Sequence, residues 1–504
     1  MMPALHIKRL RARYSLRGFG VASAGAKSKL DRLLRSMGQE EFEAALARLG
    51  LPSSEIICLR ALHVPVRIDL SRADAVVSGA WIEAFASALA TAIGRSEGFV
   101  RYGSRSQALV DVLISVGRAD VSRAWAWRQL GLWRDAAEAI GVGAAAAMMA
   151  LPESVPAALV EVAKAGALPG LISRVAPDDW MAVARAAIAT TGASSIRTIL
   201  DAAGEGSSPG TRARRDVSEM TRATARAVLA QSRLARSAAR LAGLDLRARE
   251  AMAIFAILEV DPAALSRLSD PRALLEVLLS DSMASGPKRP GGGDQFGSLR
   301  AEAKVVPQGR AERSNSIEQD RGDRQAQNEA LPTASIRRCG RTRAGGLLFL
   351  LHIVGELGLP ETLCAPGSAL AGRSLRWVLH QIALCLLPLE PNDAAALAFA
   401  GLAPDADRPS HLAEPVTELE QHAIRVASDA IVARLRQRVG NLETPRAALL
   451  LQTCRRSAEV LADPAWIEVC LSLDDVSTLL RRAGLDLDLG WLPWLGCVVR
   501  FRYA

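Results

Sequence analysis

The chain has 504 residues, of which half are hydrophobic but only 4% are aromatic, and its formal net charge is +9. This length favours two to four domains and excludes a mini-protein that needs disulfides or metal in place of a core. Alanine and leucine supply most of the apolar residues, which favours helices packed on helices. The positive charge suggests an acidic protein, a nucleic acid or an anionic membrane surface as partner.

The charge is concentrated in two blocks. Residues 1–35 carry a net charge of +8, and residues 212–249 carry +7. The remainder of the chain is therefore acidic, at −6. Any affinity for polyanions should accordingly belong to these two blocks.

Targeting and metal-binding patterns are missing from the sequence. The N-terminus lacks the apolar core of a secretory signal, and the most apolar stretch, 347–359, would reach only ~20 Å as a helix against a hydrocarbon core of ~30 Å. The seven cysteines are scattered and contain no Cys-x-x-Cys pair, so neither a disulfide framework nor a zinc cage is expected. We expect a cytoplasmic protein with no transmembrane segment, no metal and no cofactor.

Apolar residues recur at three- and four-residue spacings along most of the chain, which predicts helices. The expected helices are 28–49, 74–95, 105–118, 121–139, 155–167, 178–190, 217–242, 246–258, 262–280, 346–358, 372–387, 417–438, 445–462 and 473–483. Little room is left for a sheet.

Short strands are expected at 55–60, 64–70 and 497–503. In the last of these, Val499, Phe501 and Tyr503 alternate with other residues, as in a half-buried strand. Residues 5–14 fit either a strand or a helix. The predicted fold is mainly α, with a few short strands near the chain ends and around 55–70.

A polar, Gly- and Pro-rich segment separates two helical globular parts. Its composition cannot bury enough apolar surface to offset chain entropy, so 284–338 is predicted to be a disordered linker. The N-terminal domain is then 1–283, with a sub-break at 203–212, and the C-terminal domain is 339–504 and ends in a short strand.

The second basic block has helical geometry as well as charge. On a continuous helix over 217–242, five arginines fall within an arc of ~80°, and apolar residues recur on the opposite side every seven positions. The arginines are Arg222, Arg226, Arg233, Arg236 and Arg240. Such a face could bind an acidic protein, phosphates or an anionic surface, or it could simply be a solvated outer face. Nucleic acid is disfavoured, because no aromatic residues for base stacking interleave with the arginines.

Two patterns resemble chemical sites but lack essential parts. Residues 20–28 nearly match the sequence motif of a phosphate-binding loop. However, Ala26 separates Gly25 from Lys27, whereas the motif needs lysine directly after glycine. His352 and Glu356 lie one helical turn apart with His380 downstream, but their apolar helix favours satisfied hydrogen bonds over metal ligation. A nucleotide-binding enzyme with a degenerate phosphate loop is therefore only the third-ranked reading.

Five of the nine tryptophans form two groups. Trp125, Trp127 and Trp133 belong to one group, and Trp491 and Trp494 to the other. Core anchoring in an alanine-rich chain explains them well, and contact with a partner protein is the alternative.

Segments 100–113, 122–133 and 490–503 resemble bacterial proteins encoded beside contractile, phage-tail-like injection systems, and the last two of these segments contain the tryptophan groups. Segment 345–352 is similar to that group as well. The resemblance brings no catalytic motif, and it implies an accessory or assembly role. The expected function is that of a non-enzymatic assembly or interaction protein whose partners are other proteins of a multiprotein particle; a nucleic-acid or anionic-surface binding module is the first alternative.

Overall fold

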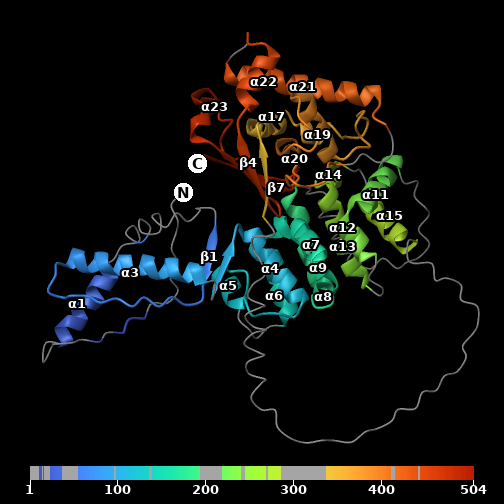
Figure 1. The fold of residues 1–504 in the computed structure, drawn as a ribbon. Coiled ribbons are helices and arrows are strands. Elements are labelled where there is room, and N and C mark those ends of the chain that lie inside the picture. Colours follow the sequence, from blue (N-terminus) through green and yellow to red (C-terminus); the bar gives the residue numbers. More distant parts are fainter. Residues whose placement is uncertain are drawn as a thin grey trace, which may run out of the picture. The chain divides into compact units, whose positions relative to one another are not determined.

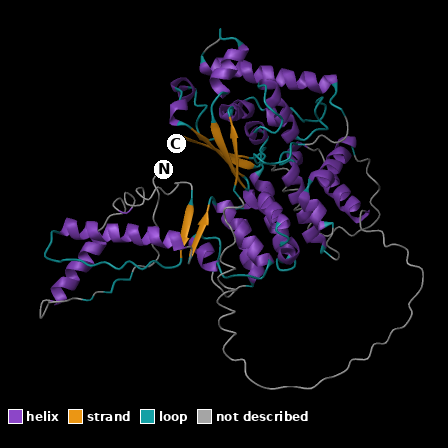
Figure 2. Cartoon of the chain, in the orientation of Figure 1, coloured by secondary structure: helices purple, strands orange, loops and turns teal. Residues whose placement is uncertain are grey.

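The computed structural model describes residues 11–13, 15, 23–36, 42, 55–95, 98–134, 139–192, 218–239, 244–267, 271–284, 337–409, 415–440 and 443–503. The described residues are mainly helical, as predicted (Figure 2). Two compact units are distinguished, Met1–Arg105 and Ser106–Ala504. Most of the expected linker, 285–336, lies outside the described residues, as do the expected sub-break at 203–212 and most of 5–14.

The first unit contains two helices and a strand pair. Its elements are α1 (Ser23–Ser36), β1 (Ile56–Leu59), α3 (Asp74–Arg95) and β2 (Phe99–Tyr102). The strands are antiparallel, with Ile56 opposite Tyr102, which confirms the strand expected at 55–60. The strand expected at 64–70 is wrong, because these residues pair with no strand. Their side chains do alternate between exposed and half-buried, but Pro65 has no N–H to give to a ladder.

Helix α3 begins and ends where the sequence predicts. Val77, Ile82, Ala86 and Leu89 of this helix are buried. Lys29 of α1 binds Asp74 in the first turn of α3, with Nζ 3.0 Å from Oδ1. Among the described single helices, α3 is long and apolar enough over Asp74–Ile93 to cross a membrane, and only 17% of this stretch is buried. The bent pair Ile140–Ala150 and Pro152–Lys164 passes the same test when taken together. The lack of a transmembrane segment therefore stays a prediction.

The second unit begins with a helical layer (Figure 1). Its elements are α4 (Arg105–Gly117), α5 (Ala124–Gln129), α6 (Ile140–Ala150), η1 (Pro152–Ser154), α7 (Val155–Lys164), α8 (Leu168–Ile172), α9 (Pro177–Thr190), α11 (Glu219–Gln231), α12 (Arg233–Ala238), α13 (Leu246–Val260), α14 (Ala264–Arg267) and α15 (Pro271–Ala284). Helices α9 and α13 form its centre, where the rings of Trp180 and Phe255 lie 6.2 Å apart.

Several expected helices of this layer are shorter or broken. Of the described residues between 121 and 134, those of α5 alone are helical, and Gly131 adopts a left-handed conformation with φ +71° soon after the end of this helix. Residues 217–242 form two helices instead of one, because Ser232 is extended and begins α12. Helix α6 was not predicted, since its run of alanines has no clear polar face.

The rest of the second unit combines helices with a five-stranded sheet. Its elements are β3 (Arg338–Thr342), η3 (Gly345–Leu350), α17 (Leu351–Glu356), α18 (Leu359–Thr362), α19 (Leu375–Leu386), α20 (Ala394–Phe399), α21 (Glu418–Val439), α22 (Arg446–Cys454), β4 (Ala458–Asp463), β5 (Trp466–Leu471), η4 (Leu473–Asp475), α23 (Thr478–Arg482), β6 (Gly490–Leu492) and β7 (Cys497–Tyr503). The strand order is β3-β4-β5-β7-β6, and only β5 and β7 pair in parallel.

This sheet corrects the expectation of little room for strands. Strand β7 was predicted, but the helix expected at 445–462 ends at Cys454, and the chain continues as β4. Ala458, Val460 and Ala462 are buried alternately along β4. A tight turn at Ala465, whose φ is +58°, returns the chain into β5. In a segment of only six residues, the spacing of apolar residues can fit a helix as well as a strand, so the spacing alone does not distinguish the two.

The apolar segment after β3 begins with two glycines, Gly345 and Gly346, at positions with no room for a side chain. A Cβ added to Gly345 would lie 2.4 Å from the Ala458 Cβ, and one added to Gly346 would lie 2.3 Å from the Thr453 carbonyl oxygen. Glycine therefore lets the 3₁₀ turn η3 pack directly on β4 and the end of α22. The helix expected at 346–358 is thus a 3₁₀ turn followed by α17.

Residues from both sides of 285–336 contact each other within the second unit. Leu375 N donates to Asp261 Oδ2 over 3.3 Å, and Arg376 Nη1 donates to the Glu259 carbonyl oxygen over 2.8 Å. Gln107 also binds Asp463. That the chain up to 283 and the chain from 339 are separate domains, each able to fold alone, stays a prediction.

Candidate functional site

Trp127 anchors a buried polar cluster between α4 and α5. Its indole is fully buried, and its Nε1 donates to Asp111 Oδ2 over 2.9 Å. Arg123 Nη1 lies 2.9 Å from the other carboxylate oxygen of Asp111, and both side chains are only 6% exposed. Trp127 is therefore a core residue whose polar atom is satisfied.

The remaining tryptophans of the first group are partly buried. The Trp133 ring centroid lies 5.3 Å from that of Trp127. Trp133 also packs against Gly143 of α6, where an added Cβ would lie 2.6 Å from the ring. Trp125 is half-buried. The structure brings Trp127 and Trp133 together as packing residues.

The C-terminal pair also contacts the fold. Trp491 Nε1 donates to the carbonyl oxygen of Thr190, the last residue of α9, over 3.0 Å. Trp494 is half-buried and packs against the apolar core of the C-terminal helices and sheet. These contacts favour core anchoring over partner contact for both residues.

The arginine stripe is divided between two helices. Arg222 and Arg226 are exposed on α11, and Arg233 and Arg236 are exposed on α12, whereas Arg240 lies outside the described residues. The single stripe predicted over 217–242 is therefore wrong, because Ser232 breaks the helix. We call the exposed side chains of Arg222, Arg226, Arg233 and Arg236 the arginine surface.

The opposite sides of α11 and α12 are buried, but not at the predicted seven-residue spacing. Thr221, Ala225 and Val228 of α11 and Leu234 of α12 are buried, whereas Ala227 is half-buried. The break shifts the register between the two helices, so the predicted row of apolar residues is not continuous. The arginines nevertheless remain on the outward side of both helices.

Glu259 of α13 fixes the break between α11 and α12. Its carboxylate accepts hydrogen bonds from Arg233 N over 2.8 Å and from Leu234 N over 3.0 Å, and the Ser232 hydroxyl donates to it as well. An anion at a helix N-terminus is favourable because the first N–H groups have no partner within the helix. This contact holds α12, with Arg233 and Arg236, in a defined position on α13.

A small recess of about 20 Å³ lies beside the inner side of α11. Its walls come from α11, from the end of α13 with α14, and from the loop that leads into α19. Asp261 and Arg267 form a buried ion pair in its lining, and Asp261 also accepts from Leu375 N at the start of α19. The recess thus contains residues from both sides of 285–336.

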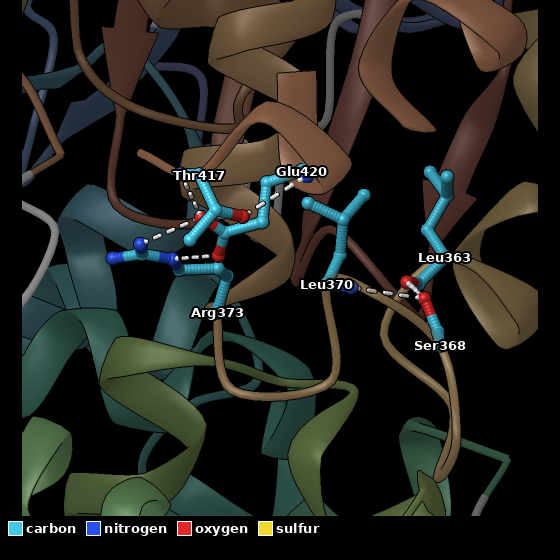
Figure 3. Close-up of polar contacts among 6 residues, drawn as sticks. All are labelled: Leu363, Ser368, Leu370, Arg373, Thr417 and Glu420. Atoms are coloured by element: carbon cyan, nitrogen blue, oxygen red, sulfur yellow. Dashed lines mark hydrogen bonds and ion pairs between the residues drawn. The ribbon is translucent and has the colours of Figure 1, made fainter. Parts of the chain in front are cut away.

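A second buried ion pair stabilises the loop that forms one wall (Figure 3). Arg373 donates to both carboxylate oxygens of Glu420, with Nε 2.6 Å from Oε1 and Nη2 3.0 Å from Oε2. Glu420 in turn accepts from Thr417 N and completes a capping box at the start of α21. These hydrogen bonds, above all those from Arg373, hold the pKa of Glu420 below its usual value.

Further back in the same loop, the Ser368 hydroxyl bridges two backbone groups. It donates to the Leu363 carbonyl oxygen over 2.5 Å and accepts from Leu370 N over 3.1 Å (Figure 3). Cys364 lines the recess next to this turn, and burial raises the pKa of its thiol to about 12. The thiol is therefore neutral at physiological pH and a poor nucleophile.

The histidines considered as ligands have separate partners. His352 Nε2 lies 2.9 Å from the Leu487 carbonyl oxygen, and His380 Nε2 lies 2.8 Å from that of Pro391. Glu356 binds Arg434 and Arg438 instead of a histidine. No group of three or more metal-ligating side chains occurs among the described residues. Each of these histidines thus has a backbone carbonyl oxygen as hydrogen-bond partner.

Part of the segment that resembles a phosphate-binding loop lies within a helix. Residues 20–22 lie outside the described part of the chain, but Gly25 and Lys27 are inside α1. A phosphate cradle needs consecutive N–H groups of a loop ahead of the helix, and these residues are already in helical turns.

Sequence reasoning missed the polar residues that organise this region. Asp261, Glu259 and Glu420 each bind groups far away in the chain, so no local spacing reveals them. For Glu420, the spacing from Thr417 is a local signal that could have been used, because it is typical of a capping box.

Comparisons with known proteins give no relative. No family model, no curated protein and no solved structure matches this chain.

Proposed function

We propose that this chain is a non-enzymatic interaction protein that takes part in assembling a multiprotein particle, and that its arginine surface binds an acidic face of a partner protein. One observation carries the proposal: four exposed arginines project from two helices whose opposite sides are buried and whose relative position is fixed by Glu259. Guanidinium groups on helices held in a defined position suit carboxylates on a folded partner, because a guanidinium group can form two parallel hydrogen bonds to one carboxylate.

The sequence resemblance supports a contractile, phage-tail-like injection system as the particle. An accessory protein of such a system needs specific docking to other proteins, and arginine is favoured at such interfaces. Electrostatic attraction would speed encounter with an acidic partner and exclude basic ones.

Charge reversal of the arginine surface tests this proposal. The fourfold variant Arg222→Glu, Arg226→Glu, Arg233→Glu, Arg236→Glu should no longer co-purify with tail-like particles or their components from the native host. A matched control reverses four other exposed arginines, Arg408, Arg425, Arg455 and Arg482, and should co-purify normally. Equal recovery of partner by both variants, or a monomer that recovers no particle component, would contradict the proposal.

Binding to random duplex DNA separates the proposal from its first alternative. The wild-type chain should bind such DNA weakly at physiological salt. Tight binding that falls steeply with salt and disappears in the fourfold variant would instead make the chain a nucleic-acid binding module.

A further inference from the structure

Large apolar side chains are exposed in the segment that connects β5 to β6 and contains η4 and α23. Four of them are between 44% and 64% exposed, namely Leu473, Val476, Leu479 and Leu487. We call these four side chains the apolar patch. Single exposed apolar residues are ordinary on a protein surface, but a group of them within one segment is typical of a contact surface.

The segment that carries the apolar patch is held to the second unit by its inner side. Leu480 is buried in the core. Arg456 Nε donates to the Asp475 carbonyl oxygen over 3.2 Å, and Arg438 Nε donates to that of Ala483 over 2.9 Å. The four exposed side chains therefore lie on the outer side of a segment that has a defined place in the fold.

Charges of opposite sign lie at the two ends of η4 and α23. Asp474 and Asp475 belong to η4, and Arg482 is the last residue of α23. In the part of the chain that the structure describes, no ion pair is formed by these three side chains. Arg481, in contrast, binds Asp486, with Nε 2.7 Å from Oδ2. The apolar patch thus has an acidic end and a basic end without partners among the described residues.

We propose that the apolar patch binds a second copy of this chain across a twofold axis. In a twofold contact both copies use the same surface, and residues i and j of one copy meet j and i of the other. An antiparallel arrangement therefore places the acidic end of each patch against the basic end of the other. The leucine and valine side chains between these ends bury one another.

The charges argue against two other occupants of the apolar patch. Asp474 and Asp475 would repel an anionic lipid surface, and they would equally repel an acidic protein face such as the one proposed for the arginine surface. The contact between copies is made by η4 and α23, whereas the arginine surface belongs to α11 and α12. A variant that stays monomeric should therefore still bind the acidic partner.

Analytical ultracentrifugation of the full-length chain in reducing buffer tests the proposal. The apparent mass should rise from that of one chain towards that of two between roughly 1 and 100 µM, because a contact of this size is weak. The reducing buffer excludes dimers joined by a disulfide. A chain that stays monomeric over this whole range would overturn the proposal.

Two charge-reversal variants test the twofold arrangement. Asp474→Lys with Asp475→Lys makes both ends of the patch basic, and Arg482→Glu makes both ends acidic, because Arg481 is already paired with Asp486. Each variant alone should dimerise at least tenfold more weakly than the wild type, through repulsion at both ends. An equimolar mixture of the two should dimerise again, since both contacts become attractive, and this recovery would also show that both variants fold. A mixture that stays monomeric would overturn the arrangement.

A pair of leucine substitutions tests the apolar part of the contact. Leu479→Ser should weaken the dimer at least tenfold, because it removes an apolar side chain from both copies. Leu419→Ser is the matched control, since Leu419 is 73% exposed on α21 and lies outside the apolar patch, and it should dimerise like the wild type. Equal weakening in both variants would show unspecific association of exposed apolar residues and would overturn the assignment to this patch.

Discussion

At the scale of single residues, buried carboxylates hold separate parts of the second unit together. Asp111 accepts hydrogen bonds from Arg123 and from the Trp127 indole. Glu420 accepts hydrogen bonds from Arg373 and from the backbone N–H of Thr417 at the start of α21. Removing one partner of such a cluster leaves another buried polar group unpaired, which costs more than the net gain from forming the pair.

Asp111→Ala should destabilise the second unit by ~3–5 kcal/mol, because it leaves the Arg123 guanidinium and the Trp127 N–H without this acceptor. Urea unfolding followed by tryptophan fluorescence measures the change. Asp120→Ala is the control, since Asp120 is only half-buried and accepts from Ser122 N, and it should cost at most ~1 kcal/mol. Similar losses in the two variants would show that Asp111 does not organise a buried cluster.

Glu420→Gln should make stability less dependent on acid pH. The pKa of Glu420 is lowered in the folded chain, chiefly by Arg373, so its contribution is complete above the unfolded pKa of ~4.3 and is lost as pH falls through the folded value. The variant should be less stable than the wild type by ~1.5–3 kcal/mol at neutral pH. This difference should shrink below about pH 4.

Denaturant unfolding at neutral and acid pH measures both effects. Glu356 supplies the matched control, because its pKa is also lowered by arginines but its pairs with Arg434 and Arg438 are more exposed. Glu356→Gln should cost less than ~1 kcal/mol. A gap between Glu420→Gln and the wild type that persists unchanged in acid would contradict the ion-pair interpretation.

At the scale of elements, the break at Ser232 determines where the arginines lie. The Ser232 hydroxyl accepts from Ala235 N and thereby caps α12, and it also donates to Glu259. Two adjacent helices with a fixed angle present Arg233 and Arg236 differently from one continuous helix. The geometry of the arginine surface therefore depends on this one cap.

Ser232→Ala should destabilise α12 by ~1–2 kcal/mol, the cost of losing an N-cap. Amide hydrogen exchange at Arg233, Leu234 and Ala235 should become faster, while α9 and α13 keep their protection. Ser237→Ala, at a half-buried position near the end of α12, should leave exchange at these three amides unchanged. Equal acceleration in both variants would show that the cap does not hold α12.

Several elements could be predicted because their signals are local. The ends of α3 follow from Asp74 and from the charged residue after its apolar run, and β7 follows from strict alternation. The break at Ser232 could not be predicted, because the residue that stabilises it, Glu259, lies 27 positions further along the chain. Strand β4 was missed for a similar reason, since its partners β3 and β5 decide between helix and strand.

At the scale of the whole molecule, the net charge of +9 does not describe one uniformly basic surface. The arginine surface belongs to the second unit, and part of the N-terminal block lies on α1 of the first unit. Lys29 of that block is already engaged by Asp74 and the Leu70 carbonyl oxygen. The arginine surface is thus the better-defined candidate for binding an acidic partner.

Site-specific photocrosslinking tests this central claim most directly. A benzophenone side chain at Ala230, an exposed position of α11, would report what lies against the arginine surface, and the same group at Val426, an exposed position of α21, would serve as control. In the native host, position 230 should crosslink to a single protein through a segment rich in aspartate and glutamate, and position 426 should not. Crosslinks from position 230 to nucleic acid, or the same products from both positions, would contradict the account.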